Sequence, residues 1–381
     1  MNKLIYLDYA ATTPVDPRVA DKLVQHLTMD GIFANPASRS HIYGWQAEAA
    51  VEGARKQVAS LLNADTREIV WTSGATESNN LAIKGVAEAR QGCGKHLITS
   101  QSEHKAVIDC FMYLESTGFR VTWLKPDENG VVTSENVLAA ICEDTILISI
   151  MHVNNETGAI NDVYKIAEIA KARDIIFHID AAQSAGKLLL DTQVLTADLI
   201  SSCAHKIYGP KGVGCLYVRR NSDLTLPAQI HGGGHERGMR SGTLATHQLV
   251  AMGEAFSIAQ ESMNEEQTEI LKLKLLFLEC LGEEVGFDIN GDVDQSVSGI
   301  LNLSFPGKDG QILLSALPGL AISSGSACTS ATMSPSHVLS SMGLSDDKAL
   351  GSLRFSFGRF TSENEVRSAA EMLRTVLIKM A

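Results

Sequence analysis

Two polar side chains follow apolar runs in the middle of the chain, where buried strands would end. Asp180 follows 177–179 and Lys206 follows 199–202 by a few residues. Ligands of α/β proteins bind at the carboxyl ends of the strands. A carboxylate there needs a partner, which could be a metal ion, a protonated ring nitrogen of a cofactor or a capped turn. A lysine there could form a Schiff base with a carbonyl cofactor, or it could be a solvated loop residue like Lys211.

A run of small residues, Ser73–Ser78, lies between an expected strand and an expected helix. Backbone N–H groups at such a helix start can hold a phosphate, although a simple turn with Thr76 as N-cap would use the same residues. The run is not a Walker A motif, because no Gly-Lys-Ser/Thr follows it. His104 also follows a strand, where it could exchange protons, stack on a ring or serve the structure alone.

Cys328 lies in the small, polar stretch Ser323–Ser330, which predicts an exposed thiol on a mobile loop. That setting suits a nucleophile that must travel, although an incidental loop cysteine would have the same neighbours. The chain has seven cysteines and no C-x-x-C pair. Together with an N-terminus that does not read as a signal peptide, this favours reduced thiols and a cytoplasmic location.

The residues named above lie in a part of the chain where expected strands and helices alternate. Short β-branched runs alternate with amphipathic stretches, which predicts a mostly parallel sheet covered by helices on both faces. The expected strands are Glu68–Trp71, His96–Ser100, Val121–Leu124, Ile146–Val153, Ile175–Asp180, Leu199–Ser202 and Val213–Val218. The expected helices between them are Thr76–Arg90, Lys105–Leu114, Glu135–Cys142 and Val163–Ala172.

The pattern changes after His231, where a Gly- and Arg-rich loop is followed by a smaller α+β unit. The elements expected there are a long helix with an irregularity (Thr246–Leu281), two strands (Ile300–Ser304 and Ser352–Phe357) and two helices (Gln311–Leu317 and Ser362–Met380). Ser362 and Glu365 fit a capping box for the last helix. Alternation in the last strand predicts that Arg354 faces away from its apolar side.

The composition bounds the class of protein. The chain has 381 residues, of which 45% are hydrophobic, so two domains with sizeable cores are expected. A net charge of −12 argues against binding to a nucleic-acid backbone or an anionic membrane. No apolar run reaches the roughly 20 residues that a membrane helix needs.

Ten strings occur together in one order and carry a resemblance. They are Tyr6–Pro14 (YLDYAATTP), Asn35–Ser38 (NPAS), Ser73–Asn80 (SGATESNN), Glu103-His104, His152–Gly158 (HVNNETG), His178–Gln183 (HIDAAQ), His205–Gly212 (HKIYGPKG), His231–Leu244 (HGGGHERGMRSGTL), Ser323–Ser330 (SSGSACTS) and Leu353–Phe360 (LRFSFGRF). Together they resemble the cysteine desulfurases of the NifS/IscS type. These belong to the aminotransferase class V group of fold-type-I pyridoxal-phosphate enzymes.

The resemblance implies a large cofactor-binding domain at 15–250 with a seven-stranded sheet. A small α+β domain would combine 1–14 with 251–381. The site would lie between the domains and at a homodimer interface.

The resemblance also implies roles in binding pyridoxal 5'-phosphate. Lys206 would form the Schiff base, Asp180 would keep the ring nitrogen protonated, and His104 would stack on the ring and take part in proton transfer. Further cofactor contacts would come from Ala75, Thr76, Asn155, Gln183, Cys203, His205 and, from the other subunit, Thr243. Asn35, Asn155 and Arg354 would bind the substrate.

The reaction implied is the conversion of L-cysteine to L-alanine. The Cys328 thiolate would attack the substrate sulfur, with His104 assisting proton removal, and would then pass its persulfide to an acceptor protein. The acceptor would be a scaffold or a sulfur carrier, and Cys328 is also a candidate transient iron–sulfur ligand; no other metal is expected. The SSGSACTS form resembles the long-loop subgroup, which serves iron–sulfur cluster assembly and transfer-RNA thiolation.

The sequence departs from the family at three places. Cys203 stands where serine or threonine is usual, which predicts weaker phosphate binding because a thiol is a poor hydrogen-bond donor. Ala34 replaces a usual glycine. The chain stops soon after Phe360, whereas family members that dock the iron–sulfur scaffold carry a longer tail. A different sulfur acceptor is therefore an alternative, such as one in DNA phosphorothioation.

Other activities fit parts of the same pattern. A selenocysteine lyase or a cysteine sulfinate desulfinase would tolerate loss of the cysteine for some substrates. An ordinary aminotransferase would not need an exposed Cys328. A catalytically idle interaction module would not need Lys206 and Cys328 together.

Overall fold

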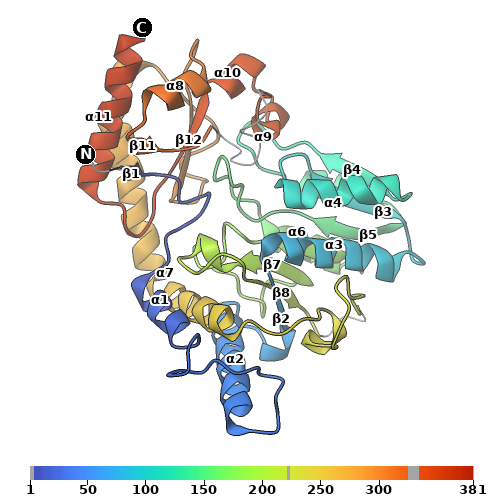
Figure 1. The fold of residues 1–381 in the computed structure, drawn as a ribbon. Helices are drawn as coiled ribbons and strands as arrows, with labels where there is room; N and C mark the ends of the chain where they lie inside the picture. Colours follow the sequence, from blue (N-terminus) through green and yellow to red (C-terminus); the bar gives the residue numbers. More distant parts are fainter. Residues whose placement is uncertain (1–3, 221–223, 325–333, 381) are drawn as a thin grey trace.

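The computed structural model describes residues 4–220, 224–324 and 334–380. It contains a seven-stranded sheet in the order β2-β8-β7-β6-β5-β3-β4 (Figure 1). The strands are β2 (Ile69–Thr72), β3 (His96–Ser100), β4 (Arg120–Leu124), β5 (Thr145–Ser149), β6 (Ile176–Asp180), β7 (Leu199–Cys203) and β8 (Gly214–Val218). In this sheet β8 runs antiparallel to β2 and β7 and the other pairs are parallel, so the mostly parallel sheet expected from the sequence is confirmed.

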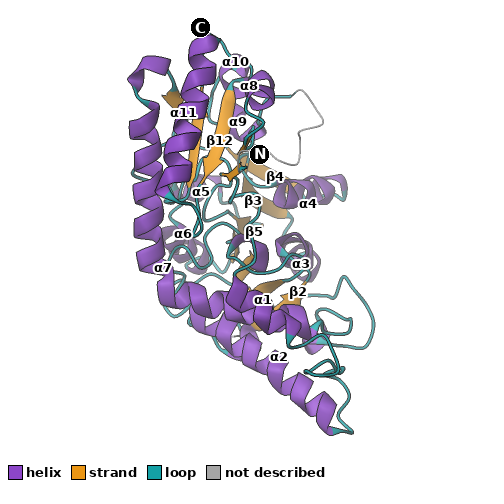
Figure 2. Ribbon diagram, turned by 60° about the vertical axis from the view of Figure 1, so that its left-hand side comes forward, coloured by secondary structure: helices purple, strands orange, loops and turns teal. Residues whose placement is uncertain are grey.

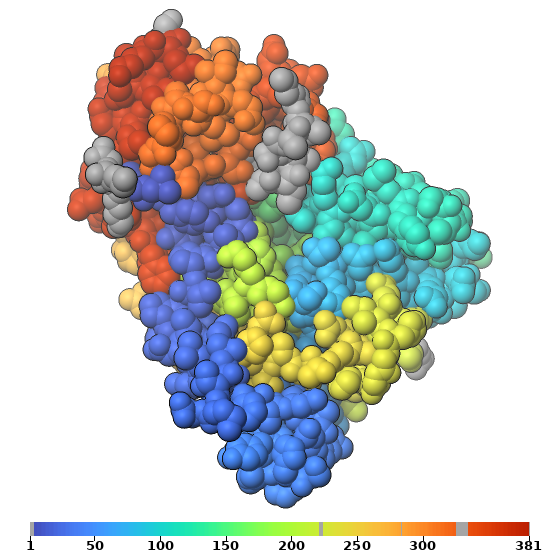
Figure 3. All heavy atoms as spheres, in the orientation of Figure 1, coloured from blue at the N-terminus to red at the C-terminus, as the bar shows by residue number. Residues whose placement is uncertain are grey.

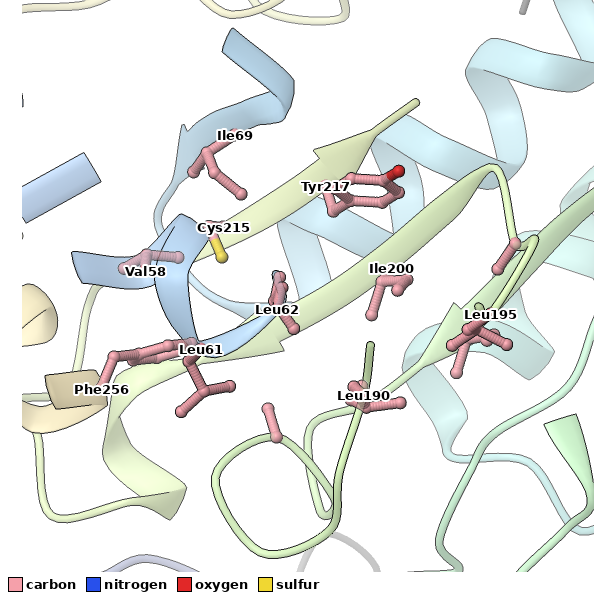
Figure 4. Close-up of a cluster of buried hydrophobic side chains, with 14 of the residues drawn as sticks. Val58, Leu61, Leu62, Ile69, Leu190, Leu195, Ile200, Cys215, Tyr217 and Phe256 are labelled. Carbon is pink, nitrogen blue, oxygen red and sulfur yellow. The ribbon is translucent and has the colours of Figure 1, made fainter. Parts of the chain in front are cut away.

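Helices cover both faces of this sheet. On one side lie α3 (Ala75–Arg90) and α4 (Lys105–Ser116), and on the other lie α2 (Ile42–Leu61), α6 (Val163–Lys171) and part of α7 (Thr246–Leu281). Successive strand residues point to opposite faces, so Leu147 packs in the α3–α4 layer and Ile148 in the α2–α6 layer. Figure 4 shows Val58 of α2 among Cys215, Ile200 and other side chains of the second layer.

The C-terminal part forms a second core around an antiparallel sheet in the order β12-β10-β9. Its elements are β9 (Asp288–Ile289), β10 (Ile300–Ser304), β12 (Ser352–Ser356), α8 (Gly310–Ala316), α9 (His337–Ser341), α10 (Asp346–Leu350) and α11 (Glu363–Lys379). The capping box of Ser362 and Glu365 opens α11 as expected. Arg354 also lies as expected, since its neighbours Leu353 and Phe355 are in the core while its guanidinium bonds to Asp8.

The start of the chain packs against this C-terminal part. Strand β1 (Ile5–Tyr6) pairs with β11 (Leu320–Ala321), and the backbone of Asp8 forms an isolated β-bridge with that of Ser356. Figure 3 shows this first segment in dark blue below the orange and red C-terminal residues. The next helix, α1 (Pro17–Val24), packs on α7.

Helix α7 joins the two cores. It is a single helix from Thr246 to Leu281, so the bounds expected for it are confirmed, and its axis changes direction partway along (Figure 2). No proline interrupts it, and its Gly253 lies where a Cβ would come within 2.7 Å of the Ala54 Cα atom in α2. Its first half contributes Phe256 to the core under the large sheet, and its second half contributes Phe277 to the C-terminal core. The domain division at residue 250 therefore falls inside a continuous helix, and it stays a prediction.

Two other expectations need correction. The strand expected at Ile146–Val153 ends at Ser149, because the Met151 N–H donates to the buried carboxylate of Glu103 rather than to a strand. Helices α1 and α2 lie in a region where no element was expected.

A histidine inside the large sheet makes the fold acid-sensitive. His178 is fully buried, and its two ring nitrogens contact the hydroxyls of Ser149 and Ser201 at 2.8 and 2.9 Å. Burial lowers the pKa of His178 from 6.5 to about 3. The unfolded chain therefore binds this proton first, and stability is lost as pH falls below 6.5. Between pH 7.5 and 5 we expect a loss of about 2 kcal/mol from this group.

Urea unfolding at the two pH values measures this loss. We expect His178→Asn to show a smaller difference between them than the wild type. The variant His231→Asn, at an exposed position, should keep the full difference. An equal pH dependence in all three proteins would show that His178 is not the source.

Candidate active site

A cavity of about 570 Å³ lies at the carboxyl ends of β6 and β7. It is lined by the following residues that the sequence predicted for the site: Ala75, Thr76, His104, Asn155, Asp180, Gln183, Cys203, His205, Lys206 and Arg354. They come from both halves of the chain, since Arg354 belongs to β12 and the rest to the large sheet and its loops. A larger hollow of about 750 Å³ lies along α7, and it contains none of the predicted residues.

Lys206 enters the cavity from a short helical turn that follows β7. Its Nζ donates to the carbonyl oxygen of Ala11 at 2.7 Å and also to that of Ala10. Burial lowers the pKa of Lys206, because little water reaches the ammonium group. A larger share of this lysine is therefore the neutral amine, which is the form that attacks a carbonyl carbon.

Asp180 ends β6 and is 5% exposed. Its Oδ2 accepts from the Asn79 side chain at 2.7 Å, and its Oδ1 accepts from the Ala182 N–H at 2.9 Å. These two bonds fix a carboxylate that lines the cavity together with Lys206. Such a carboxylate can hold a proton on a ring nitrogen.

The start of α3 supplies backbone donors on another wall. Gly74 precedes the helix with a φ of 153°, a conformation that other residues rarely adopt, and Ala75 is the first helical residue. The first N–H groups of a helix have no partner within it, so they can bind a phosphate. Near them burial raises the pKa of the Cys203 thiol to about 11 and lowers the pKa of His205 to about 4. Both side chains are therefore uncharged at neutral pH.

Two histidines line the cavity with fixed tautomers. The Ala106 N–H donates to Nδ1 of His104 at 3.1 Å, so the neutral ring carries its proton on Nε2. Nε2 of His337 lies 2.9 Å from the carbonyl oxygen of Glu103, so it carries a proton there, and in the neutral ring Nδ1 is then an acceptor. Burial also lowers the pKa of His104, which keeps that ring neutral.

Unpartnered polar atoms mark the side of the cavity near β12. Arg354 donates to Asp8 Oδ1 and to the Asn155 carbonyl oxygen, both at 2.8 Å. Its Nε and the Asn155 Oδ1 are buried without a partner in the described part of the chain. Buried polar atoms normally have partners, so these two are suited to a polar ligand.

Two predicted residues, Asn35 and Thr243, are not brought into the cavity. Asn35 lines a separate hollow of about 460 Å³ with Gly233, His235 and Leu244. Thr243 is exposed and outside the 570 Å³ cavity. Cys328 lies outside the described residues.

The structure adds three side chains that the sequence reading did not single out. Glu156 and His337 line the cavity, and Lys187 bonds to Gln183 behind it. The spacing of Lys187, four residues after Gln183, could have identified it. His337 had no local signal, since only the fold brings it to this wall.

The donors present fit pyridoxal phosphate: a buried amine for its aldehyde, a carboxylate for its ring nitrogen and a helix start for its phosphate. The unpartnered Arg354 Nε and Asn155 Oδ1 are suited to bind a polar substrate beside it. Within the described ranges no group of three or more His, Cys, Asp or Glu side chains is arranged to hold a metal ion. No helix in those ranges is long and apolar enough to span a bilayer.

Comparisons with known proteins agree with this geometry. The family model "Aminotransferase class-V" matches residues 5–368. "Cysteine desulfurase IscS" of Vibrio cholerae serotype O1 is 58% identical over 376 residues, which cover 99% of this chain and 93% of the relative. A solved "NifS-like protein" aligns with a TM-score of 0.92 at 35% identity, covering 99% of this chain and 100% of the other. A structure of "SspA in complex with cysteine" aligns with a TM-score of 0.81 at 40% identity, covering 94% of this chain and 100% of the other.

Proposed function

Because the chain belongs to the aminotransferase class-V family and is a pyridoxal-phosphate-dependent cysteine desulfurase of the NifS/IscS type, we propose that the 570 Å³ cavity is where it converts L-cysteine to L-alanine. The observation that carries this assignment is the convergence of Lys206, Asp180, His104 and Arg354 on that cavity.

Each of these residues has a distinct part. When bound, the cofactor supplies an electron sink for negative charge at the substrate α-carbon. Lys206 would hold the aldehyde carbon, and Asp180 would keep a proton on the ring nitrogen. His104 presents a proton at Nε2, and Arg354 orients the substrate carboxylate together with Asn155. The ring of His337 offers Nδ1 as an acceptor on the same wall.

Sulfur transfer is assigned to Cys328. Its thiolate takes the sulfur atom from the substrate and becomes a persulfide, while alanine is released. A thiol of ordinary pKa is only a few per cent ionised at neutral pH, so the proton needs an acceptor. The persulfide then passes to a thiol of an acceptor protein, such as a scaffold or a sulfur carrier.

The active unit is proposed to be a cytoplasmic homodimer. Asn35 and Thr243 lie outside the cavity of their own chain, which is the position expected of residues that serve a partner's cavity. The described cysteines are all free thiols, which suits a reducing compartment.

Product analysis with purified holoenzyme tests the proposed function. We expect alanine and sulfide in equal amounts from L-cysteine with a thiol reductant. Without reductant, a persulfide should be trapped by alkylation on the peptide that contains Cys328. Faster turnover of L-selenocysteine or L-cysteine sulfinate, without a persulfide, would replace this function by that of a lyase or desulfinase.

The thiol at position 203 leads to a separate prediction about the affinity for the cofactor. Cys203 is 2% exposed beside the start of α3, where a hydroxyl would donate more strongly to a phosphate. We expect Cys203→Ser to lower the dissociation constant of pyridoxal phosphate about threefold to tenfold, which corresponds to one better hydrogen bond. Equilibrium binding to the apoenzyme measures this, and an unchanged or weaker affinity would contradict it.

A further inference from the structure

Lys187 fixes the orientation of a side-chain amide at the cavity. It lies four residues after Gln183, and its Nζ donates to Gln183 Oε1 at 2.9 Å. An ammonium group only donates, so the atom that faces Lys187 must be the amide oxygen. The amide nitrogen then points the other way, where it donates to the Ala10 carbonyl oxygen at 2.8 Å. Lys206 Nζ donates to the same carbonyl, so the amide NH₂ lies next to the reactive amine.

Lys187 is held in surroundings that disfavour its charge. Burial, with Lys206 nearby, lowers the pKa of Lys187 to about 8. The other ionisable groups that act on it are Cys203, Glu266 and Arg354. Beside it lies a void of about 20 Å³ that Gln267 also lines, and the buried Oε1 of Gln267 has no partner in the described part of the chain. An apolar side chain would avoid the cost of placing a cation here, so Lys187 is not explained by stability.

We propose that Lys187 is a positioning residue that makes Gln183 present its NH₂, and not its carbonyl oxygen, to the phenolic oxygen of the cofactor. The inference rests on the proposed cofactor site. That phenolic oxygen carries negative charge, which an N–H donor stabilises and a carbonyl oxygen repels. Without Lys187 the orientation of the amide depends only on the bond from its nitrogen to the Ala10 carbonyl oxygen, for which Lys206 competes, and the two ends of the amide have nearly the same shape.

The orientation of the amide changes an observable of the holoenzyme. Stabilising the phenolic oxygen as an anion makes the adjacent proton of the cofactor–lysine linkage easier to lose. Loss of the N–H donor therefore raises the midpoint of the pH-dependent change in the yellow absorption band. For Lys187→Met we expect a rise of about one pH unit. Lys187→Arg keeps a donor, so its midpoint should stay within a few tenths of a unit of the wild type.

A double variant separates positioning from a direct effect of the charge. In a Gln183→Leu background the amide is gone, so adding Lys187→Met should shift the midpoint no further. A second shift of the midpoint by the full amount in that background would overturn the inference, because the charge of Lys187 would then act on the cofactor without Gln183. An unshifted Lys187→Met midpoint would also overturn it. Lys187→Met should unfold at a temperature no lower than that of the wild type, which excludes general disruption.

Failure of the proposed function has a different signature. A wild-type protein that develops no yellow band with pyridoxal phosphate would remove the cofactor site and this inference together. A normal band with unshifted variants would remove only the role of Lys187.

Discussion

Replacing Lys206 with alanine lowers alanine release from L-cysteine by roughly four orders of magnitude or more, because the variant lacks the amine that holds the cofactor. Lys206→Arg keeps the positive charge and should be equally inactive, since a guanidinium stays protonated. Both variants should lose the lysine-linked yellow band while they still bind the cofactor weakly. Assays of alanine release and absorption spectra on the same preparations measure the two effects.

Lys211 provides the control for this experiment. It is exposed at the rim of the same cavity, and we expect Lys211→Ala to keep activity within a few-fold of the wild type. A Lys206→Ala protein that keeps the yellow band and full turnover would contradict the assignment. The nearby amine of Lys187 would then be the next residue to test.

Replacing Cys328 with alanine should stop sulfur transfer while leaving the cofactor bound. We expect alanine release from L-cysteine to fall by roughly three orders of magnitude or more, because no other group replaces a thiolate nucleophile. The yellow band should remain, and L-cysteine should still change it when it binds. This separates loss of the nucleophile from loss of the site.

Two exposed thiols serve as matched controls. Cys93 and Cys142 are free and exposed, so Cys93→Ala and Cys142→Ala should keep activity within about twofold of the wild type. Mass spectrometry of alkylated protein should find the persulfide on Cys328 in both control variants. Activity retained in Cys328→Ala would instead support a lyase or desulfinase.

The sequence predicted the large sheet well because its strands are short β-branched runs. It did not predict α2, whose buried positions include small residues such as Gly44, Ala47 and Ala54. Small residues pack closely on α7 but give little periodic hydrophobicity. The bounds of α7 were predicted, although its packing partners change halfway along.

Site residues were predictable where they end a strand, as Asp180 does, or follow it within a short turn, as Lys206 does. Site residues whose position depends on the packing of distant segments were harder to predict. His337 reaches the cavity through the placement of α9, and the tautomers of His104 and His337 depend on backbone partners that no sequence pattern specifies. Asn35 and Thr243 are proposed to act in the cavity of a second chain, and the fold of one chain does not define the position of another.

The anchoring of the N-terminal segment bears on when the enzyme becomes active during its synthesis. The carbonyls of Ala10 and Ala11 hold Lys206, yet the Ala10 N–H donates to Ser356, which is 346 residues away in the chain. Ser356 follows Lys206 by 150 residues, which a ribosome adds in roughly 8 to 30 s. Throughout that time the reactive lysine lacks its finished surroundings. We therefore expect the nascent chain to acquire its cofactor only after release, so that unfinished chains do not liberate sulfide.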